Sequence, residues 1–527
     1  MLKMVDGTGI IGVDMVCPLG GVVSPPQPPN YDKVEMEGVG SLMLPNSLKA
    51  PLERVELIGN SVQGENPAPD NPQEIKSAGR KSKNLFNIAD LRVGQVQKDG
   101  TINEKQIYYR TVILDVPQDG KYRITFNSND DYTMLYFTEA YANGVYSNPY
   151  VRVHAGSPNY YITLAKGKNI LSFSTHTASG IIVFTTDHNI MIAAESETLD
   201  YEPYGYFFDV KVTGKNLFDM ADIQNENGKI ESNYGIAKSI KPFNIIKDRK
   251  YLLISKGTVI ADVKYSSIYF GKDDLEYNHG HNNILSTSTG YSCFIGEETR
   301  KILTAKETCT ITKTIIHGVD AAKDAYEVEE LGLFEIINDN PNIDYEPYTE
   351  QAMQIVLDEP LRGIGEYKGM LTKDGVVRKI KRTVFDENTP FKEYNAPVQV
   401  KTTSFISGTT IKDATGETGI EVMSDRFKAK DRGFDRYDEE CITLFGKNIF
   451  VRFNKDKNIN TAEALTEWLK QNPLTVDYVL AEPVTEPLPE SVQAQLSALH
   501  SENGTTHVFV DSGEVEAGIK LTYRKEI

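Results

Sequence analysis

The chain has 527 residues, 40% of them hydrophobic and 25% charged, which predicts about three or four domains of ordinary soluble composition. Its formal net charge of -18 argues against binding to nucleic acid and to an anionic membrane surface. The four scattered cysteines form no Cys-x-x-Cys pair, so they predict neither a disulfide framework nor a structural zinc site, and we expect assembly in a reducing cytoplasm.

Residues 1–30 are predicted to be an N-terminal arm and spacer. The apolar stretch at residues 10–23 is too short to span a bilayer and contains Asp14. One basic residue, Lys3, precedes this stretch and no clear small-residue cleavage site follows it, so we expect no secretory signal. Residues 24–29, Ser-Pro-Pro-Gln-Pro-Pro, predict a stiff polyproline-like spacer.

A dinucleotide-binding pattern, G-x-G-x-x-G, occurs in this arm as Gly7-Thr8-Gly9-Ile10-Ile11-Gly12. Such a site needs a helix opening on the glycines and a second strand beyond it. Pro18, Gly20, Gly21 and the Pro-rich spacer exclude both elements. We therefore expect a flexible or β-paired arm, and no cofactor.

Residues 31–82 predict a small β connector module that ends in a turn-rich strap at residues 67–72. From there on the composition favours strands. The chain has 28 Tyr and 21 Phe but one Trp, and its 40 Gly and 24 Pro are spread between short elements.

The strongest internal feature is a repeat with matching ends. Lys-Asn-Leu-Phe opens one unit at Lys83 and a second at Lys215, and Asp-Tyr-Glu-Pro-Tyr closes them at residues 200–204 and 344–348. A period this long indicates two whole domains rather than a solenoid. We predict β-sandwich repeat 1 at residues 83–205 and repeat 2 at residues 214–348.

Each repeat is expected to consist of successive short strands, which favours a sandwich or jelly roll. Tyr122, Ile124 and Phe126 alternate with polar neighbours, and apolar strands precede both closing motifs. The predicted strands span residues 159–164, 169–174, 181–184 and 190–192 in repeat 1 and residues 251–255, 259–265, 308–316 and 333–337 in repeat 2.

Residues 349–527 are predicted to form a smaller α+β region. One helix is expected to start at an Asn460 cap, with Glu463 in capping-box position, and to end near Lys470. A second helix is expected at residues 490–501. Strands are predicted on either side of these helices, at residues 476–481, 507–511 and 518–523.

The order of several motifs resembles the minor structural, baseplate or tail-fibre proteins of tailed bacteriophages and prophages of Firmicutes. Apart from the two repeat units, the motifs are Gly59-Asn60-Ser61-Val62-Gln63, residues 69–75, Leu361-Arg362-Gly363-Ile364-Gly365, Asn472-Pro473 to Glu482-Pro483, and Leu496-Ser497-Ala498-Leu499 with Gly504-Thr505-Thr506-His507. Together they cover most of the chain from about residue 40 onward.

The resemblance implies a virion component of the tail, usually a homotrimer, whose repeats are similar to carbohydrate-binding jelly rolls. Its expected partners are other tail or baseplate proteins and a host-surface glycan. We expect assembly in the host cytoplasm and release by lysis. No catalytic residue carries over from the family, and a tail-attachment role for residues 1–30 is inferred from position alone.

Two groups of residues could hold a metal ion, although a polar turn or loop is the simpler interpretation of each. Asn129, Asp130 and Asp131 lie in an oxygen-rich cluster of the kind calcium prefers, without EF-hand spacing. His279 and His281 would share one face of a strand, but no clear third ligand is nearby.

Tyrosines are the candidate ligand-binding residues, because sugar sites generally combine aromatic faces with polar groups. The alternative is that these side chains fill a sandwich core or a subunit interface. The candidates are Tyr141, Tyr146 and Tyr150 in repeat 1 and Tyr265 and Tyr269 in repeat 2.

The sequence contains no nucleophile elbow, no His-Glu-x-x-His and no recognised Cys/His arrangement, so we predict a protein that is not an enzyme. Three functions compete. They are a virion structural protein with carbohydrate recognition, a purely structural spacer, and a tail-associated glycan hydrolase or depolymerase.

Overall fold

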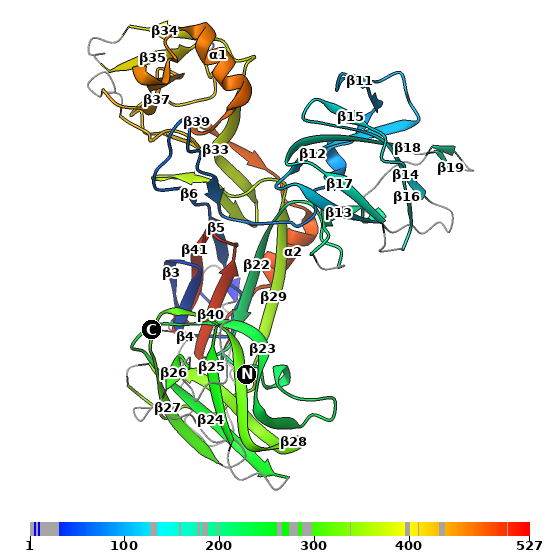
Figure 1. Cartoon of the computed structure of the whole chain (residues 1–527). Coiled ribbons are helices and arrows are strands. Elements are labelled where there is room, and N and C mark those ends of the chain that lie inside the picture. The colour runs from blue at the N-terminus through cyan, green and yellow to red at the C-terminus, as the bar shows by residue number, and fades with distance from the viewer. Residues whose placement is uncertain are drawn as a thin grey trace.

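A computed structural model describes most of the chain. The described residues are 5–6, 9–10, 31–126, 134–156, 160–174, 176–177, 180–181, 188–197, 200–260, 266–272, 283–286, 298–337, 339–395, 401–408, 410–431, 438–502 and 504–526. Within them the chain is mainly β and has two α-helices, which confirms the predicted fold class (Figure 1).

A 12-stranded sheet, which we call the stem, forms the centre of the molecule (Figure 1). Its main path is β29-β22-β40-β4-β41-β5-β32-β33-β39-β36, with β3 on β41 and β8 on β22. The strands are β3 (Tyr31–Val39), β4 (Ser41–Ser47), β5 (Arg54–Ile58), β8 (Arg80–Lys81), β22 (Tyr206–Thr213), β29 (Glu350–Leu357), β32 (Met370–Thr372), β33 (Gly375–Phe385), β36 (Val422–Ser424), β39 (Leu474–Glu486), β40 (Gly504–Asp511) and β41 (Gly518–Glu526).

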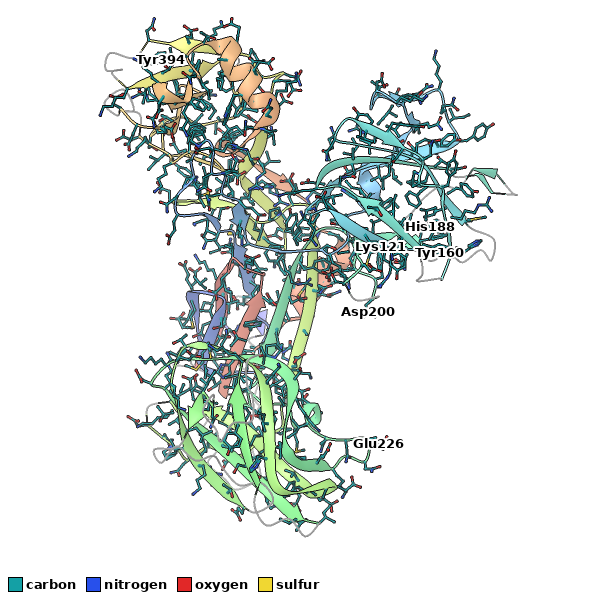
Figure 2. The ribbon with its side chains drawn as sticks, viewed as in Figure 1. Lys121, Tyr160, His188, Asp200, Glu226 and Tyr394 are labelled. Atoms are coloured by element: carbon teal, nitrogen blue, oxygen red, sulfur yellow. The ribbon has the colours of Figure 1, made fainter. Side chains whose placement is uncertain are left out.

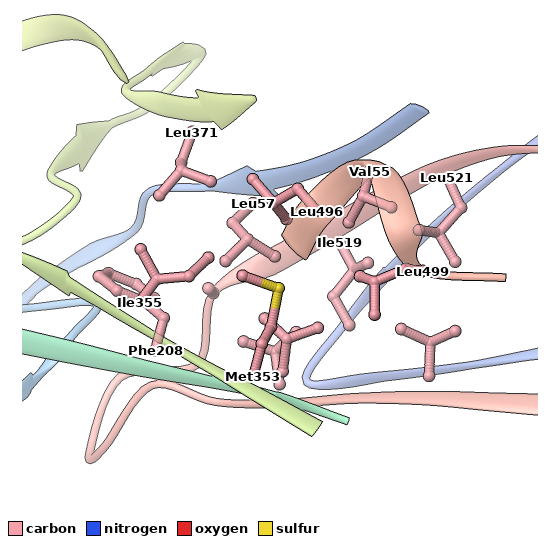
Figure 3. Close-up of a cluster of buried hydrophobic side chains, with 14 of the residues drawn as sticks. Val55, Leu57, Phe208, Met353, Ile355, Leu371, Leu496, Leu499, Ile519 and Leu521 are labelled. Atoms are coloured by element: carbon pink, nitrogen blue, oxygen red, sulfur yellow. The ribbon is translucent and has the colours of Figure 1, made fainter. Parts of the chain in front are cut away.

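The stem crosses two of the predicted domain boundaries. Strands from residues 31–82 pair with strands from residues 349–527, and β22 lies just after repeat 1 and pairs with β29 and β40. Its core contains Leu57, Phe208, Ile355 and Ile519, packed with Leu496 of α2 (Glu490–Ala498) (Figure 3). The connector and the C-terminal region therefore share one sheet and one core.

Repeat 1 is a two-sheet sandwich that extends to one side of the stem (Figure 1). One sheet has the order β15-β14-β18-β12-β9, with β16 on β14, and the other has the order β17-β13-β21. The strands are β9 (Arg92–Val93), β12 (Tyr109–Val116), β13 (Gly120–Thr125), β14 (Met134–Ala142), β15 (Val145–Ser147), β16 (Val151–His154), β17 (Tyr160–Leu164), β18 (Gly167–Ser174) and β21 (Met191–Ala194).

Repeat 2 has the same pairing pattern. In the larger sheet, the neighbouring strands β14, β18 and β12 of repeat 1 correspond to β25, the first half of β28, and β23. In the smaller sheet, β17, β13 and β21 correspond to β27, β24 and the second half of β28. The strands are β23 (Ile230–Ile245), β24 (Lys250–Val259), β25 (Ser266–Gly271), β26 (Leu285–Ser286), β27 (Thr299–Ala305) and β28 (Cys309–Glu335).

The ends of each repeat are held together by one buried asparagine. The Asn84 Oδ1 accepts from the N–H groups of Phe86 and Ile192, and its Nδ2 donates to the carbonyls of Ile190 and Glu202. Asn216 repeats this arrangement. It accepts from Phe218 and Leu333 and donates to the Glu346 carbonyl 3.1 Å away. The Asn of the opening motif thus binds the Tyr-Glu-Pro-Tyr backbone at the close.

The region beyond the stem contains a four-stranded sheet and helix α1 (Ala462–Gln471). The sheet has the order β34 (Phe391–Tyr394), β35 (Thr402–Ser407), β38 (Asn448–Asn454), β37 (Cys441–Phe445). Helix α1 is capped by Thr461, whose Oγ1 accepts from the Ala464 N–H at 3.2 Å, so the predicted Asn460 cap is wrong by one residue. Helix α2 ends at Ala498, three residues before the predicted end.

The remaining described elements are short. They are the hairpins β1 (Val5–Asp6) with β2 (Gly9–Ile10), β6 (Ser61–Gln63) with β7 (Ile75–Ser77), β10 (Gln95–Val96) with β11 (Ile102–Asn103), β19 (His176–Thr177) with β20 (Gly180–Ile181), and β30 (Gly363–Ile364) with β31 (Tyr367–Lys368), and the 3₁₀ helices Ile88–Asp90, Met220–Asp222 and Lys455–Lys457.

Candidate functional site: the tyrosine face of repeat 1

The larger sheet of repeat 1 has one buried face and one outer face, because successive side chains of a strand point to opposite sides. The buried face supplies the sandwich core with Val112, Leu114, Leu135, Phe137, Leu171 and Phe173. The intervening residues of β12, β18 and β14 therefore lie on the outer face.

Three cross-strand rows cover this outer face. The first row pairs Tyr109 with Ser174 and Ser174 with Tyr136. The second row is Thr111, Ser172 and Glu139, and the third is Ile113, Ile170 and Tyr141, which continues to Tyr146 on β15. We call Tyr109, Tyr136, Glu139, Tyr141, Tyr146 and Tyr150 the tyrosine face.

Electrostatic coupling links the middle of this face. The pKa of Tyr146 is raised by burial first, and then by the charges of Glu139, Tyr150 and Tyr109. The pKa of Tyr109 is raised in the same way, by burial and then by Glu139 and Tyr150. These phenols remain protonated at neutral pH and can donate hydrogen bonds to a ligand.

Tyr150 has an unusual backbone conformation for a bulky residue. Its φ is 49°, in the left-handed region, and its side chain is 67% exposed. A non-glycine residue in this region costs on the order of 1–2 kcal/mol, and such residues cluster at functional sites. The backbone thus holds an aromatic ring out into solvent beside Tyr146.

Glu139 is a half-buried carboxylate in the middle row. It accepts a hydrogen bond from the Thr138 hydroxyl, and none of the described residues forms an ion pair with it. The nearby cations have other partners. Arg152 donates to the Tyr136 hydroxyl and lies over its ring, and Arg110 donates to the carbonyls of Ile107 and Tyr109, both at 3.1 Å.

The hairpin β10–β11 packs over part of the face, against the middle row and Tyr141. The Thr111 hydroxyl donates to the Gly94 carbonyl at 2.7 Å, and the Val96 N–H donates to the Ser172 hydroxyl at 2.7 Å. A Cβ atom added at Gly100 would lie 2.6 Å from the Tyr141 ring. Tyr141, Thr111 and Ser172 thus lie under this hairpin, whereas Tyr150 is exposed.

The predicted site residues are not brought together as one set. Tyr141, Tyr146 and Tyr150 share the tyrosine face, whereas Tyr269 lies in repeat 2, half-buried in β25 opposite Ile315. Tyr265, the calcium candidates Asn129, Asp130 and Asp131, and the His279 and His281 pair lie outside the described residues. Among the described residues, no group of three His, Cys, Asp or Glu side chains could hold a metal ion.

Sequence reasoning missed Tyr109 and Glu139. Tyr109 is far along the chain from residues 136–150 and reaches them because β18 pairs with β12 on one side and β14 on the other. Glu139 follows a β-bulge between Phe137 and Glu139, which sets the face to which it points. The Tyr136-x-x-Glu139 spacing could not indicate a shared face without that bulge.

A second concave region lies between the stem and repeat 2. This junction cavity has a volume of about 350 Å³, and its walls include Leu42, Lys211, Phe243, Arg249 and His507. The Arg249 guanidinium pairs with Glu335, and the Lys211 Nζ lies 3.7 Å from Glu350 and donates to the Pro242 carbonyl. Each of these ion pairs lies within one part, but the Lys211–Pro242 hydrogen bond and the Lys241–Glu350 ion pair (3.8 Å) join the stem to repeat 2, so the cavity belongs to the contact between them.

Unlike Arg249 and Lys211, His507 has a ring nitrogen without a partner in this cavity among the described residues. Its Nε2 is shielded from solvent and has no hydrogen-bond partner among the described residues. Burial, and secondarily the positive charge of Arg249, lowers the pKa of His507 to about 4. The imidazole is therefore neutral at pH 7.

No helix within the described part of the chain is long and apolar enough to cross a membrane.

Comparison with known proteins gives no relative by sequence. Neither the models of protein families nor the curated protein sequences match the chain. Among solved structures, infectious bursal disease virus of the Gt strain aligns with 9% identity over 95% of this chain and 84% of that chain, and the Gx strain with 8% identity over 94% and 82%. Both alignments have a TM-score of 0.12, which is too low to support any conclusion about fold or function.

Proposed function

We propose that the chain is a structural protein of a phage tail, in the baseplate or a tail fibre, and that repeat 1 binds a host-surface carbohydrate. The observation that carries the binding proposal is the tyrosine face, where the Glu139 carboxylate lies in the row between Tyr109 and Tyr141 and acts on Tyr109 and Tyr146. Aromatic rings pack on the C–H surfaces of sugars, while phenol hydroxyls and a carboxylate bind their hydroxyl groups.

The tail assignment rests on the order of sequence motifs that resembles Firmicutes phage tail proteins. In this proposal the protein is a homotrimer held among other tail or baseplate proteins, assembled in the host cytoplasm and released by lysis. A weak sugar site gains from linkage, because several linked copies can gain a factor of about 10²–10⁴ in avidity. Repeat 1 carries the binding face and extends away from the stem (Figure 1).

The experiment is co-sedimentation of the full chain with purified cell walls from a panel of Firmicutes. We expect wild-type protein to bind one or more of these walls. The double variant Tyr146→Ala/Tyr150→Ala should bind at least about tenfold more weakly, equivalent to about 1.4 kcal/mol. Tyr31→Ala is the matched control, because Tyr31 is an exposed tyrosine (42%) on the stem strand β3. Equal loss in the double variant and in Tyr31→Ala would contradict the assignment of this face.

Two other functions give different outcomes in the same assay. A purely structural spacer would leave every wall preparation unbound, even with the chain artificially trimerised. A glycan hydrolase would release reducing sugar from the walls, a step that our proposal of a non-enzymatic protein does not include.

A further inference from the structure

We propose that the tyrosine face prefers a glycan that carries a free, positively charged amino group, such as an amino sugar without its acetyl group. This inference rests on the proposed carbohydrate binding and adds the charge of the ligand. It follows from the position of Glu139 and from the cations that the structure places elsewhere.

Glu139 occupies the middle row of the face, between the row of Tyr109 and Tyr136 and the row of Tyr141. Its carboxylate is half-buried and accepts a hydrogen bond from the neutral hydroxyl of Thr138. A ligand that covers the face removes the remaining water from this charge. That removal is costly unless the ligand supplies a compensating positive charge, and a charge-assisted hydrogen bond from an ammonium group does so.

Elsewhere in repeat 1 the protein supplies its own cations to tyrosine rings. The Lys121 Nζ lies 4.1 Å from the centroid of the Tyr161 ring, and Arg123 lies 5.5 Å from it, on the opposite sheet that also carries Tyr160 (Figure 2). On the tyrosine face, Arg152 lies 4.7 Å from the Tyr136 ring.

The rings around Glu139 differ from these. Within the described residues, no lysine or arginine lies over Tyr109, Tyr146 or Tyr150, and Tyr150 is held 67% exposed. Aromatic faces attract cations, and cages of aromatic rings are a common way of binding ammonium groups. These rings and the Glu139 carboxylate therefore offer a place for a cation that no lysine or arginine of the described residues fills.

The test compares two probes that share one ring, glucosamine and N-acetylglucosamine, by calorimetric or NMR titration of the full chain at pH 6.5. We expect glucosamine to bind at least fivefold more tightly, and the preference to weaken at high salt. Glu139→Gln should bring the two affinities within about twofold of each other, because it removes the charge that favours glucosamine. Glu139→Asp, which keeps the charge, should retain part of the preference.

The outcomes separate the two proposals. Equal binding of both sugars, or a preference that survives Glu139→Gln, overturns the charge preference and leaves carbohydrate binding intact. Binding of neither sugar together with no binding to cell walls overturns the proposed function and this inference with it. Wild-type selectivity is informative by itself, so the test does not depend on the variants folding.

Discussion

Repeat 1 and repeat 2 share strand pairing and the asparagine that joins their ends, but their outer faces differ. In repeat 1, β12, β18 and β14 carry Tyr109, Tyr136, Glu139 and Tyr141 on that face. The corresponding rows of repeat 2 are Ala237, Ile315 and Tyr269, and Ser239, Lys313 and Gly271. Ile315 is 1% exposed, so this part of the face is covered.

The repeats also differ in what they contact. Repeat 2 packs on the stem through the junction around Lys211 and Lys241, whereas repeat 1 extends to the side of the stem (Figure 1). A duplicated domain can keep its core and closing contacts while its surface changes, because core packing and outer-face residues lie on opposite sides of the same strands. In our account one copy braces the molecule and the other copy binds.

The largest expected effect concerns the feature that the repeats share. Asn84→Ala removes four hydrogen bonds and leaves their backbone partners near the closing motif without the side chain, so we expect repeat 1 to lose about 3–4 kcal/mol of unfolding free energy. Asn216→Ala should destabilise repeat 2 slightly less, because three bonds are lost. Denaturant unfolding with hydrogen exchange assigns each loss to its repeat.

Asn87→Ala is the matched control for Asn84→Ala. It removes a cap from the 3₁₀ helix at Ile88–Asp90, where its side chain accepts from the Ala89 N–H, and should cost about 1 kcal/mol. Equal effects of Asn87→Ala and Asn84→Ala would show that the buried asparagine does not hold the repeat closed.

How far the sequence predicts this structure depends on the range of the interaction. The alternating strands and the helix at residues 462–471 follow local periodicity and capping, and the repeat follows from matching motifs. The stem does not follow from local patterns, because its adjacent strands β4, β40 and β22 come from three segments that are far apart in the sequence. The repeats also share an Asp-x-Lys-Tyr motif, at residues 119–122 and 248–251, which the sequence analysis missed. Both of its tyrosines are buried at equivalent positions.

The candidate site was predicted in part for the same reason. Tyr146 and Tyr150 were identified by local tyrosine density, and Tyr141 was included although it packs under the β10–β11 hairpin. Tyr109 and Glu139 depend on strand order and on a bulge, which no single stretch of sequence encodes.

A second, smaller effect distinguishes the junction between the stem and repeat 2 from repeat 1 by its pH dependence. The folded-state pKa of His507, about 4, lies below the ordinary value of 6.5, so the unfolded chain takes up the proton first as pH falls. The free energy of unfolding is highest above about pH 6.5, where His507 is neutral in both the folded and the unfolded chain. Between about pH 6.5 and pH 4 it falls by about 1.4 kcal/mol per pH unit, or about 3 kcal/mol in all. Hydrogen exchange at pH 7 and pH 5 should show loosening at β4 and β40.

The strands of repeat 1 serve as the internal control for this effect. His507→Gln should flatten the pH dependence at the junction between the stem and repeat 2. An unchanged dependence in that variant would mean that His507 does not control the junction. Equal loosening in repeat 1 and at β4 and β40 would remove the distinction between repeat 1 and the junction.

The smallest expected effect tests whether Tyr150 is kept for binding. Asn tolerates the left-handed region better than Tyr, so Tyr150→Asn should raise the stability of repeat 1 by up to about 1 kcal/mol while weakening binding to cell walls. Thermal unfolding and co-sedimentation measure the two changes. A variant that is less stable than wild type would show that Tyr150 serves packing rather than binding.

The central claim, that repeat 1 binds and repeat 2 braces, is tested most directly by hydrogen exchange of the full chain with and without soluble cell-wall glycan. The account predicts protection at residues 107–111 and 134–152 of repeat 1, and unchanged exchange at residues 266–271 and 309–317 of repeat 2. Protection confined to the repeat 2 segments, with repeat 1 unchanged, would contradict it.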